Sequence, residues 1–334
     1  MGDFLVEVED LSVQFRLPRT APFRQQATLH AVDGVSLQVR RGTTFGVVGQ
    51  SGSGKSTLAL AVMALAPIAS GRVIIGGVDV GRLRGAALRQ ARRGFQMVFQ
   101  DPFASLDPRR RAGALVREPL DRLGLLDRPG RERRVAELID VVGLPPEAAR
   151  LFPHQFSGGQ RQRLCIARAL ATSPDLVVCD EPVSALDVAI QAQVLTLLRR
   201  LQREQGLTYI FISHDLAVVQ QLCDDVAVMH MGRIVEQAPA ASLFAVPRHP
   251  YPWSLMTAAL SGGPAGRALR ARYLVSGETP SAIDPPPGCR FATQCPFMEA
   301  RCTGGDIPLM KVGPQHLSAC VRQDELPAPE FGCG

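Results

Sequence analysis

The segment Gly49–Thr57, GQSGSGKST, has the residue types and the spacing of a phosphate-binding loop, G-x-x-x-x-G-K-[ST]. Glycines let the backbone wrap closely around phosphate oxygens, and successive N–H groups then point inward. We expect Lys55 to reach the β and γ phosphates and Ser56 to hold Mg²⁺. The pattern therefore predicts a site for ATP and Mg²⁺, whose expected contacts are Gly49, Ser51, Gly52, Gly54, Lys55, Ser56 and Thr57.

The lysine of this loop is unusual for the chain, because only two of its 37 basic residues, Lys55 and Lys311, are lysines. An ammonium is a compact point charge with three rotatable donors, whereas a guanidinium is a broad planar fork. A position among phosphate oxygens favours the compact charge. This use of lysine is consistent with nucleotide binding.

Two neighbouring carboxylates, Asp180 and Glu181, directly follow the apolar run Leu176–Cys179, which reads as a buried strand. The ends of parallel strands line the ligand crevice of an α/β sheet. We expect Asp180 to bind Mg²⁺ together with Ser56, and Glu181 to orient or deprotonate the attacking water. An acidic pair that caps a helix is the alternative interpretation.

Two further polar residues follow predicted strands. His214 comes after Tyr209–Ile212, and Gln100 comes after Gln96–Phe99. The expected sheet order would bring both side chains near the γ phosphate, where Gln100 could also contact Mg²⁺. A lone histidine is more often a structural residue, so the prediction for His214 depends on that sheet order.

The segment Phe156–Arg163, FSGGQRQR, predicts a second phosphate-binding helix terminus. Serine is a good N-cap residue, and Ser157 precedes an expected helix through Arg161–Ala171. Gly158 and Gly159 would expose backbone N–H groups at its start, where the helix dipole favours anions. An ordinary helix-initiating turn is the alternative.

This segment closely resembles the signature motif of ABC-transporter ATPases, and the other motifs follow in that family's order. The resemblance implies that GQSGSGKST is Walker A, that Asp180 and Glu181 are the Walker B aspartate and the catalytic glutamate, and that His214 is the switch histidine. Gln100 corresponds to the Q-loop glutamine, and Ser184–Asp187, SALD, corresponds to the D-loop. The nucleotide contacts implied for the signature and the D-loop are Ser157, Gly158, Gly159, Gln160 and Asp187.

The resemblance also implies a dimer, because each nucleotide in ABC ATPases lies between the Walker A loop of one subunit and the signature of the other. This chain carries one of each. The family's adenine-stacking aromatic lies upstream of Walker A, where Phe15 is the best match and Phe23 is the competitor. Either ring could instead pack in the core.

Three stretches, Phe99–Arg110, Cys179–Leu198 and His249–Met256, resemble the ATPase subunits of oligopeptide and dipeptide importers, and Gly277–Pro296 resembles their C-terminal extension. The resemblance implies an ATP-hydrolysing subunit that powers peptide import by ATP-driven closure of a dimer against two integral membrane permease subunits. It would lie peripherally at the cytoplasmic face of the inner membrane, with Phe103–Pro108 near the permease contact. Its implied partners also include a second ATPase and, indirectly, an extracytoplasmic solute-binding protein. The sequence leaves open whether that ATPase is another copy of the chain, and the resemblance favours a homologous, non-identical subunit.

Two alternatives remain open. The solute could be nickel or another compound, because solute choice belongs to the binding protein and the permease. A soluble ABC ATPase acting on DNA or ribosomes would instead carry a long coiled-coil insertion or a tandem second cassette, and neither is visible in the sequence. Nucleic acid is therefore not an expected partner.

Four of the eight cysteines have the spacing C-x₅-C-x₆-C-x₁₇-C near the C-terminus: Cys289, Cys295, Cys302 and Cys320. The segment around them is rich in turns and poor in apolar residues, so a cross-link or an inorganic centre is expected. Four thiolates suit a [4Fe-4S] cluster or a tetrahedral zinc site, and the resemblance to peptide importers implies the cluster. Zinc, with His316 in place of one cysteine, and a metal-free or disulfide state are the alternatives.

The remaining cysteines have simpler interpretations. Cys165, Cys179 and Cys223 lie in apolar stretches and are expected to be small core residues. Cys333, next to the last residue, is expected to be a free thiol.

These motifs need a fold that brings strand ends and helix starts to one place. The strand Thr44–Val48, TFGVV, runs directly into Walker A, and an apolar helix through LALAVMALA follows. We predict an α/β P-loop nucleotide-binding domain of the ABC type in residues 1–243, with an inserted helical subdomain at about 101–172. Residues 244–334 are predicted to form a linker and a small cysteine-containing C-terminal extension.

Composition supports a globular protein. The 334 residues suggest about two domains, and 46% hydrophobic with 20% charged residues excludes collagen-like, disordered and coiled-coil chains. The longest apolar run, Leu58–Ala69, contains Pro67 and is shorter than the roughly 20 residues that span a bilayer. No secretory signal is visible, so we expect a cytosolic protein. The net charge of +6 is spread among acidic residues and does not favour a nucleic-acid surface.

Overall fold

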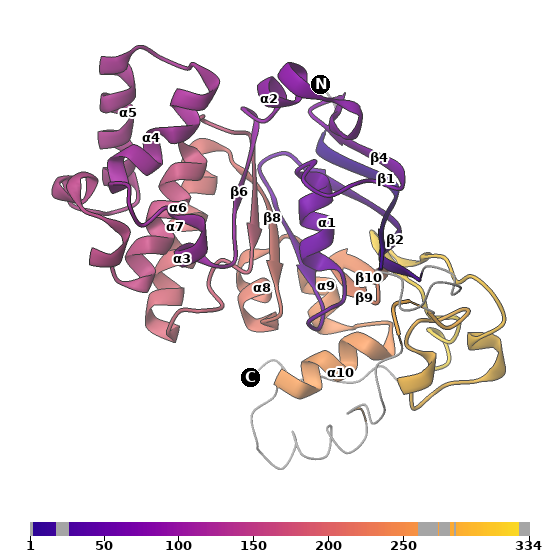
Figure 1. The fold of residues 1–334 in the computed structure, drawn as a ribbon. Coiled ribbons are helices and arrows are strands. Elements are labelled where there is room, and N and C mark those ends of the chain that lie inside the picture. Colours follow the sequence, from indigo (N-terminus) through magenta and orange to yellow (C-terminus); the bar gives the residue numbers. More distant parts are fainter. Residues whose placement is uncertain (1–2, 18–26, 260–272, 274–280, 284, 327–334) are drawn as a thin grey trace. The chain divides into compact units, whose positions relative to one another are not determined.

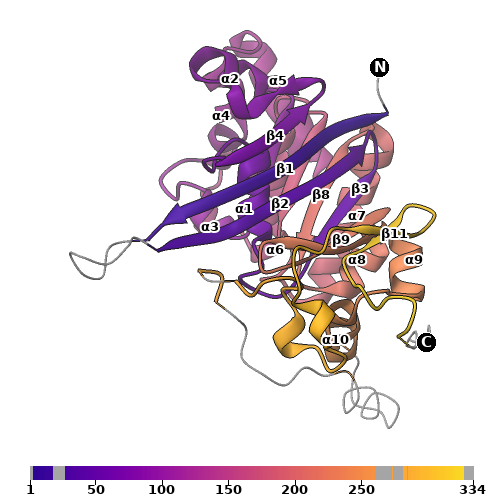
Figure 2. The same cartoon turned by 90° about the vertical axis from the view of Figure 1, so that its right-hand side faces the viewer.

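The computed structural model, drawn in Figures 1 and 2, describes residues 3–17, 27–259, 273, 281–283 and 285–326. The chain divides into two compact units, each of which collects segments that are far apart in the sequence. The first unit contains the described parts of residues 1–6, 38–44 and 74–212, and the second contains those of 7–37, 45–73 and 213–334. Phe23 and Cys333 lie outside the described residues.

The first unit is built on three parallel strands, β6 (Phe95–Val98), β7 (Leu176–Asp180) and β8 (Thr208–Ser213), with β7 in the middle. Val98 is paired with Cys179, which in turn is paired with Phe211. Every residue of β7 and β8 is buried. Burial on both faces explains why these strands are nearly continuous apolar runs rather than alternating patterns.

A group of helices follows β6 in the first unit (Figure 1). It comprises α3 (Pro102–Ser105), α4 (Ala112–Leu123), α5 (Arg128–Val141) and α6 (Gly158–Leu170), with 3₁₀ turns at Pro146–Arg150 and Pro153–Gln155. Helix α4 contacts both α5 and α6. It buries Leu115, Val116 and Leu120, which lie on one face at helical spacing. The helices fall within the range predicted for a helical subdomain, while the domain boundaries themselves stay a prediction.

The other elements of the first unit are short, apart from one long helix. They are β5 (Val78–Asp79), the 3₁₀ turn Val80–Arg82, α2 (Gly85–Ala91) and α7 (Val188–Gln205). Strand β5 pairs with the end of β4 (Ser70–Ile75). Helix α7 contacts α6.

The second unit contains a sheet in which β3 (Thr44–Val48) pairs in parallel with β9 (Asp225–His230). Antiparallel pairs then join β9 to β10 (Arg233–Pro239), β10 to β12 (His316–Ser318), and β12 to β11 (Met310–Gly313). The β11–β12 hairpin near the C-terminus therefore extends the sheet that contains the strand before Walker A. Two long strands, β1 (Phe4–Arg16) and β2 (Thr28–Arg40), lie side by side (Figure 2).

The described residues of the second unit include the helices α1 (Lys55–Val62), α8 (Leu216–Leu222), α9 (Ala240–Ala245) and α10 (Pro250–Ala259). The 3₁₀ turns Ala292–Gln294 and Ala300–Cys302 follow. Helix α10 contacts α8 and buries the single tryptophan, Trp253, whose Nε1 donates to the Pro247 carbonyl oxygen at 2.8 Å.

The predicted strands are confirmed, and one predicted helix is shorter than expected. The strand before Walker A is Thr44–Val48, as predicted. The helix after the loop, α1, ends at Val62 rather than continuing through LALAVMALA, because Ala64 adopts a left-handed φ of 51° that no helix accommodates. Cys165, Cys179 and Cys223 are buried, as predicted for core residues.

One prediction from composition concerns membranes. Within the described part of the chain, no helix combines the length and the apolar character needed to cross a membrane.

Candidate functional site

The loop between β3 and α1 contains glycines at which a side chain would not fit. A Cβ on Gly49 would lie 2.1 Å from the carbonyl oxygen of Met229 in β9. A Cβ on Gly54, whose φ is +102°, would lie 2.2 Å from the carbonyl oxygen of Ala31 in β2. The loop therefore lies directly against the backbone of two strands, a closeness that glycine alone permits. This glycine-lined curl fits a phosphate cradle.

Lys55 lies inside the curl of this loop and is buried. Its Nζ donates to the carbonyl oxygens of Gly49 and Gln50 at 2.8 Å each. These acceptors are neutral, so phosphate oxygens, which carry full charge, would compete for the ammonium effectively. Of the other predicted loop contacts, Ser51, Gly52 and Ser56 are exposed, and Thr57 is half-buried.

Gln100 and Glu181 meet at the carboxyl edge of the first unit's sheet. Gln100 Nε2 donates to Glu181 Oε2 at 3.0 Å. Because a carboxylate can only accept, this contact turns the amide oxygen of Gln100 away from Glu181. An amide oxygen is a ligand that suits Mg²⁺. The structure therefore brings together two of the residues that the sequence named for catalysis.

Glu181 has a left-handed backbone with φ of +46°, which is uncommon for a residue other than glycine. Its N–H donates to the Ile212 carbonyl oxygen at 3.0 Å, and its own carbonyl oxygen accepts from Ser184 Oγ at 3.1 Å. Such backbone conformations persist when their surroundings hold them, and they concentrate at functional sites. Asp180, the preceding residue, ends β7 and is buried.

The predicted cap of the signature helix is confirmed. Helix α6 begins at Gly158, and Ser157 Oγ accepts from Gln160 N–H at 3.4 Å while Gln160 Oε1 accepts from Ser157 N–H at 3.0 Å. A Cβ on Gly159 would lie 2.3 Å from Ile190 Cγ2 in α7. Gly159 is therefore required for packing between two helices, a reason that the sequence did not reveal.

The other predicted site residues lie at the ends of elements. His214 is exposed and follows β8. Asp187 is the N-cap of α7, where its Oδ1 accepts from Ile190 N–H at 3.0 Å. Phe15 lies near the end of β1 and is 37% exposed, which leaves part of its ring open to a ligand. The nucleotide contacts of all three stay predictions.

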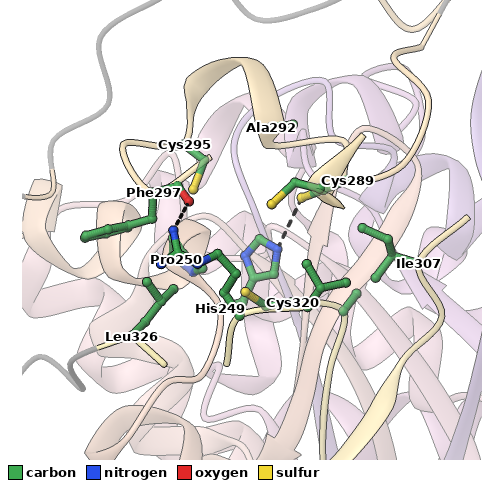
Figure 3. Close-up of a pocket in the computed structure, with 13 residues that line it drawn as sticks. His249, Pro250, Cys289, Ala292, Cys295, Phe297, Ile307, Cys320 and Leu326 are labelled. Atoms are coloured by element: carbon green, nitrogen blue, oxygen red, sulfur yellow. Dashed lines mark hydrogen bonds between the residues drawn. The ribbon is translucent and has the colours of Figure 1, made fainter. Parts of the chain in front are cut away.

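The four cysteines Cys289, Cys295, Cys302 and Cys320 line one pocket, together with His249, as Figure 3 shows for the residues that it labels. We call these five residues the cysteine pocket. A backbone hydrogen bond between two separate parts of the segment holds it, since Cys289 N–H donates to the Cys302 carbonyl oxygen at 2.8 Å. Strand pairing positions Cys320, which follows β12, because Ala319 N–H donates to the Val235 carbonyl oxygen in β10 at 2.8 Å.

Burial disfavours the thiolate form of three of these cysteines. It raises the pKa of Cys289, that of Cys295 to about 11 and that of Cys320 to about 12. Metal centres bind thiolates, so a bound cation would have to offset this desolvation. Among the residues that the structure describes, no group of three or more histidine, cysteine or acidic side chains has the geometry of a metal-ion site. The [4Fe-4S] cluster therefore stays a prediction.

The histidine in the pocket is His249, which the sequence analysis did not single out. Its Nε2 lies 3.7 Å from Cys289 Sγ (Figure 3). His316, the predicted substitute ligand, is not among the pocket-lining residues. Its Nε2 lies 2.7 Å from Glu236 Oε1, and both side chains are buried. The pairing of β12 with β10 causes this, because it places His316 beside Glu236.

Comparisons with known proteins agree with the geometry. Residues 32–184 match the family described as ABC transporter, and residues 235–302 match the oligopeptide/dipeptide transporter C-terminal region. A protein of Brucella ovis named as a peptide import ATP-binding protein is 45% identical over 300 residues, which is 90% of this chain and 94% of that protein. The chain belongs to the ABC-transporter ATP-binding family. A Sinorhizobium fredii protein named as a peptide ABC transporter ATP-binding protein is 47% identical to this ABC ATPase over 320 residues, which is 96% of this chain and 90% of that protein.

Solved structures give the same assignment for the fold. A dimeric, post-hydrolysis structure of an ATP-binding cassette with ADP and phosphate matches with a TM-score of 0.63 and 28% identity, over 70% of this chain and 98% of that one. CbiO1 from Clostridium perfringens matches with a TM-score of 0.62 and 26% identity, over 73% of this chain and 91% of that one. The predicted α/β P-loop fold of the ABC type is confirmed, and the protein is an ATPase of that type.

Proposed function

We propose that this ABC ATPase is the ATP-hydrolysing subunit of an importer for dipeptides and oligopeptides. The observation that carries the proposal is the presence in one chain of the ABC match at 32–184 and the oligopeptide/dipeptide match at 235–302. In this proposal the chain consists of an ABC ATPase domain at residues 1–243, with a helical subdomain at about 101–172, and of a linker and C-terminal extension at residues 244–334.

The chemistry of the proposed cycle is mainly positioning and charge neutralisation. ATP with Mg²⁺, when bound, supplies the phosphoanhydride bond that is hydrolysed. The ammonium of Lys55 would hydrogen-bond the β and γ phosphates in place of the loop carbonyls. Ser56, Asp180 and Gln100 would hold the metal. Glu181, which Gln100 holds in place, orients the attacking water and accepts its proton.

The same proposal includes a second cassette, because the signature of one subunit completes the nucleotide site of the other. The signature of this chain, Ser157, Gly158, Gly159 and Gln160, would complete the nucleotide site of the partner, and the partner's signature would complete the site of this chain. In that site His214 would lie near the γ phosphate, and Phe15 would stack on adenine. A homologous, non-identical ATPase is the proposed partner. The pair lies peripherally at the cytoplasmic face of the membrane against two permease subunits, which receive solute from an extracytoplasmic binding protein.

A specific surface supports the permease contact. Phe103 in α3 is 61% exposed, and the guanidinium carbon of Arg161 lies 3.9 Å from the centre of its ring. An exposed ring of this kind is a suitable anchor for a partner protein. We include Phe103–Pro108 in the proposed contact.

The experiment that tests transport is reconstitution of the chain with its partner ATPase and the permease subunits that co-purify with it. Proteoliposomes that contain the wild-type chain are expected to take up a labelled tripeptide when ATP and the binding protein are supplied, and Glu181→Gln vesicles are not. Uptake of ⁶³Ni²⁺ without any peptide uptake would replace the peptide proposal with the nickel alternative.

We also propose a [4Fe-4S] cluster in the cysteine pocket, supported by the four thiols that line it. Protein purified without oxygen is expected to contain about four iron and four sulfide ions per chain, and Cys320→Ser is expected to lose them. Cys165→Ser, which alters a buried thiol of the first unit, is the matched control. One zinc ion without sulfide, or a metal-free chain, would contradict the cluster.

A further inference from the structure

A short series of hydrogen bonds joins the Walker A loop to the cysteine pocket, and all of its members belong to the second unit. Gln50 N–H in the loop donates to the hydroxyl of Tyr251 at 2.9 Å. Tyr251 N–H donates to His249 Nδ1 at 3.0 Å, and His249 Nε2 lies 3.7 Å from Cys289 Sγ (Figure 3). Three contacts therefore lead from the phosphate loop to a pocket cysteine.

The chemistry of imidazole sets the direction of the last contact. A backbone N–H can only donate, so Nδ1 of His249 accepts, and in a neutral ring the hydrogen then resides on Nε2. Because Nδ1 accepts this bond, it carries no hydrogen, and the ring is therefore neutral with its hydrogen on Nε2. Nε2–H therefore donates to the sulfur of Cys289, as an outer partner does for a thiolate ligand.

The buried carboxylate of Glu236 anchors the backbone of Arg248 and His249. The N–H groups of Arg248 and His249 donate to the two carboxylate oxygens of Glu236 at 2.7 Å each. Glu236 has no exposed surface, so water does not compete for these bonds. A displacement at Cys289 is thus transmitted along the series rather than absorbed by a loose segment.

Ring packing supplies a second contact with the same segment. The Tyr251 ring lies 5.3 Å from the ring of Phe291 and 4.2 Å from that of His230, between centroids. Phe291 is two residues from Cys289 in the sequence. Tyr251 therefore contacts the region of the cysteine both through His249 and through an aromatic face.

We propose that Tyr251 is a positioning residue for the Walker A loop and that, through His249, it couples the cysteine pocket to nucleotide binding. A group bound at Cys289 then alters the affinity for ATP, and bound nucleotide alters the affinity for that group by the same factor, because binding linkage is reciprocal. The inference rests on nucleotide binding by the loop and is independent of which solute is transported.

The first test separates positioning from general packing. Tyr251→Phe keeps the ring and removes the hydroxyl, so KM for ATP is expected to rise about fivefold with kcat changed less than about twofold. Tyr209→Phe is the matched control, because the Tyr209 hydroxyl is buried without a hydrogen-bond partner among the described residues. An unchanged KM in Tyr251→Phe would overturn the positioning role.

The second test measures the effect of bound nucleotide on the reactivity of Cys289. The full-length chain is first freed of bound metal by a chelator, which is then removed, so that the thiol of Cys289 is available. The rate of its alkylation by iodoacetamide, measured by peptide mass spectrometry, is expected to change at least about threefold when ADP and Mg²⁺ are added. Cys165, a buried thiol of the first unit, is the internal reference. In Tyr251→Phe the nucleotide effect on Cys289 should disappear. An equal effect in both proteins, or none in the wild type, would contradict the coupling.

Lys55→Ala distinguishes failure of this inference from failure of the nucleotide site. That variant is expected to lose ATP binding. If Lys55→Ala loses binding while Tyr251→Phe behaves as the wild type in both tests, the coupling is wrong and the nucleotide site stands. If Lys55→Ala binds ATP normally, the assignment of the loop itself is wrong.

Discussion

Glu181 has a backbone conformation that most residues avoid, and this conformation determines where its carboxylate lies. Its φ of +46° turns the chain sharply after β7, and Gln100 Nε2 holds the carboxylate at 3.0 Å. The carboxylate is thus presented at a strand end instead of continuing into the sheet. Orientation of this kind is what activation of a water molecule requires.

Glu181→Gln is expected to lower ATP turnover at least about 100-fold, because the amide cannot accept a proton from water. Binding of ATP should persist, since the shape of the side chain is retained. Phosphate release and equilibrium binding of a fluorescent ATP analogue measure the two properties separately. Normal turnover in this variant would remove Glu181 from its role.

His230 makes the stability of the second unit depend on pH. Burial, together with the charge of Arg290, lowers its pKa to about 4, whereas an exposed histidine has a pKa of about 6.5. Between these values the unfolded chain binds a proton that the folded chain does not. The free energy of unfolding is therefore expected to fall on acidification from about pH 6.5 to 4, by at most about 1.4 kcal/mol per pH unit from this residue.

Urea unfolding at several pH values, followed by the fluorescence of the single tryptophan, Trp253, checks this dependence. His230→Asn should show a shallower loss of stability on acidification than the wild type, because its side chain does not titrate. Equal slopes for the two proteins would show that His230 is not the group responsible.

At the scale of elements, the first turn of the signature helix serves both as a capped helix start and as an interface with a second helix. Ser157 and Gln160 close the N-terminus of α6, while Gly159 lets α6 approach α7. The sequence pattern predicts only that the start of this helix exposes backbone N–H groups to an anion. The packing against Ile190 adds a steric requirement at the same place.

Gly159→Ala is expected to lower the free energy of unfolding by about 1–3 kcal/mol, because its methyl group would lie 2.3 Å from Ile190 Cγ2. Gly158→Ala is the matched control on the same turn, since its Cβ would meet Leu186 at 3.5 Å, an ordinary contact. Chemical denaturation of the two variants measures the difference. Equal stabilities would mean that Ile190 moves aside without cost.

The sequence predicted the strands before the functional residues well, because each is a short apolar run ended by polar or glycine residues. It was less accurate for α1, whose apolar pattern continues past the point where Ala64 turns left-handed. It also could not reveal that the β11–β12 hairpin joins the sheet through β10. That pairing depends on residues about 80 positions apart, which no local pattern records.

At the scale of the whole molecule, the chain joins an ABC cassette to a C-terminal region typical of oligopeptide and dipeptide transporters. The second unit contains both the Walker A loop and the cysteine pocket. The first unit contains the helices that present Phe103. The proposed assembly therefore uses residues of both units for nucleotide binding, and helices of the first unit for contact with a permease.

Phe103→Ala is expected to weaken binding to the permease subunits at least about fivefold, because an exposed aromatic ring often dominates such a contact. Its free energy of unfolding should change little, since most of the ring is already exposed. Val78→Ala, at another exposed position of the same unit, is the matched control. Co-purification of permease subunits in equal amount with the wild type and with Phe103→Ala would place the contact elsewhere.

The sequence by itself determined the chemistry of the phosphate loop and the order of the family's motifs, because consecutive residues carry that information and short-range rules interpret it. Only the tertiary structure decided that His249 rather than His316 faces the cysteines, and that Tyr251 reaches Gln50 across 201 positions of the chain. Those contacts depend on which strands pair and on how side chains pack around them. Strand pairing and side-chain packing depend on residues far apart in the sequence, so local patterns could not predict these contacts.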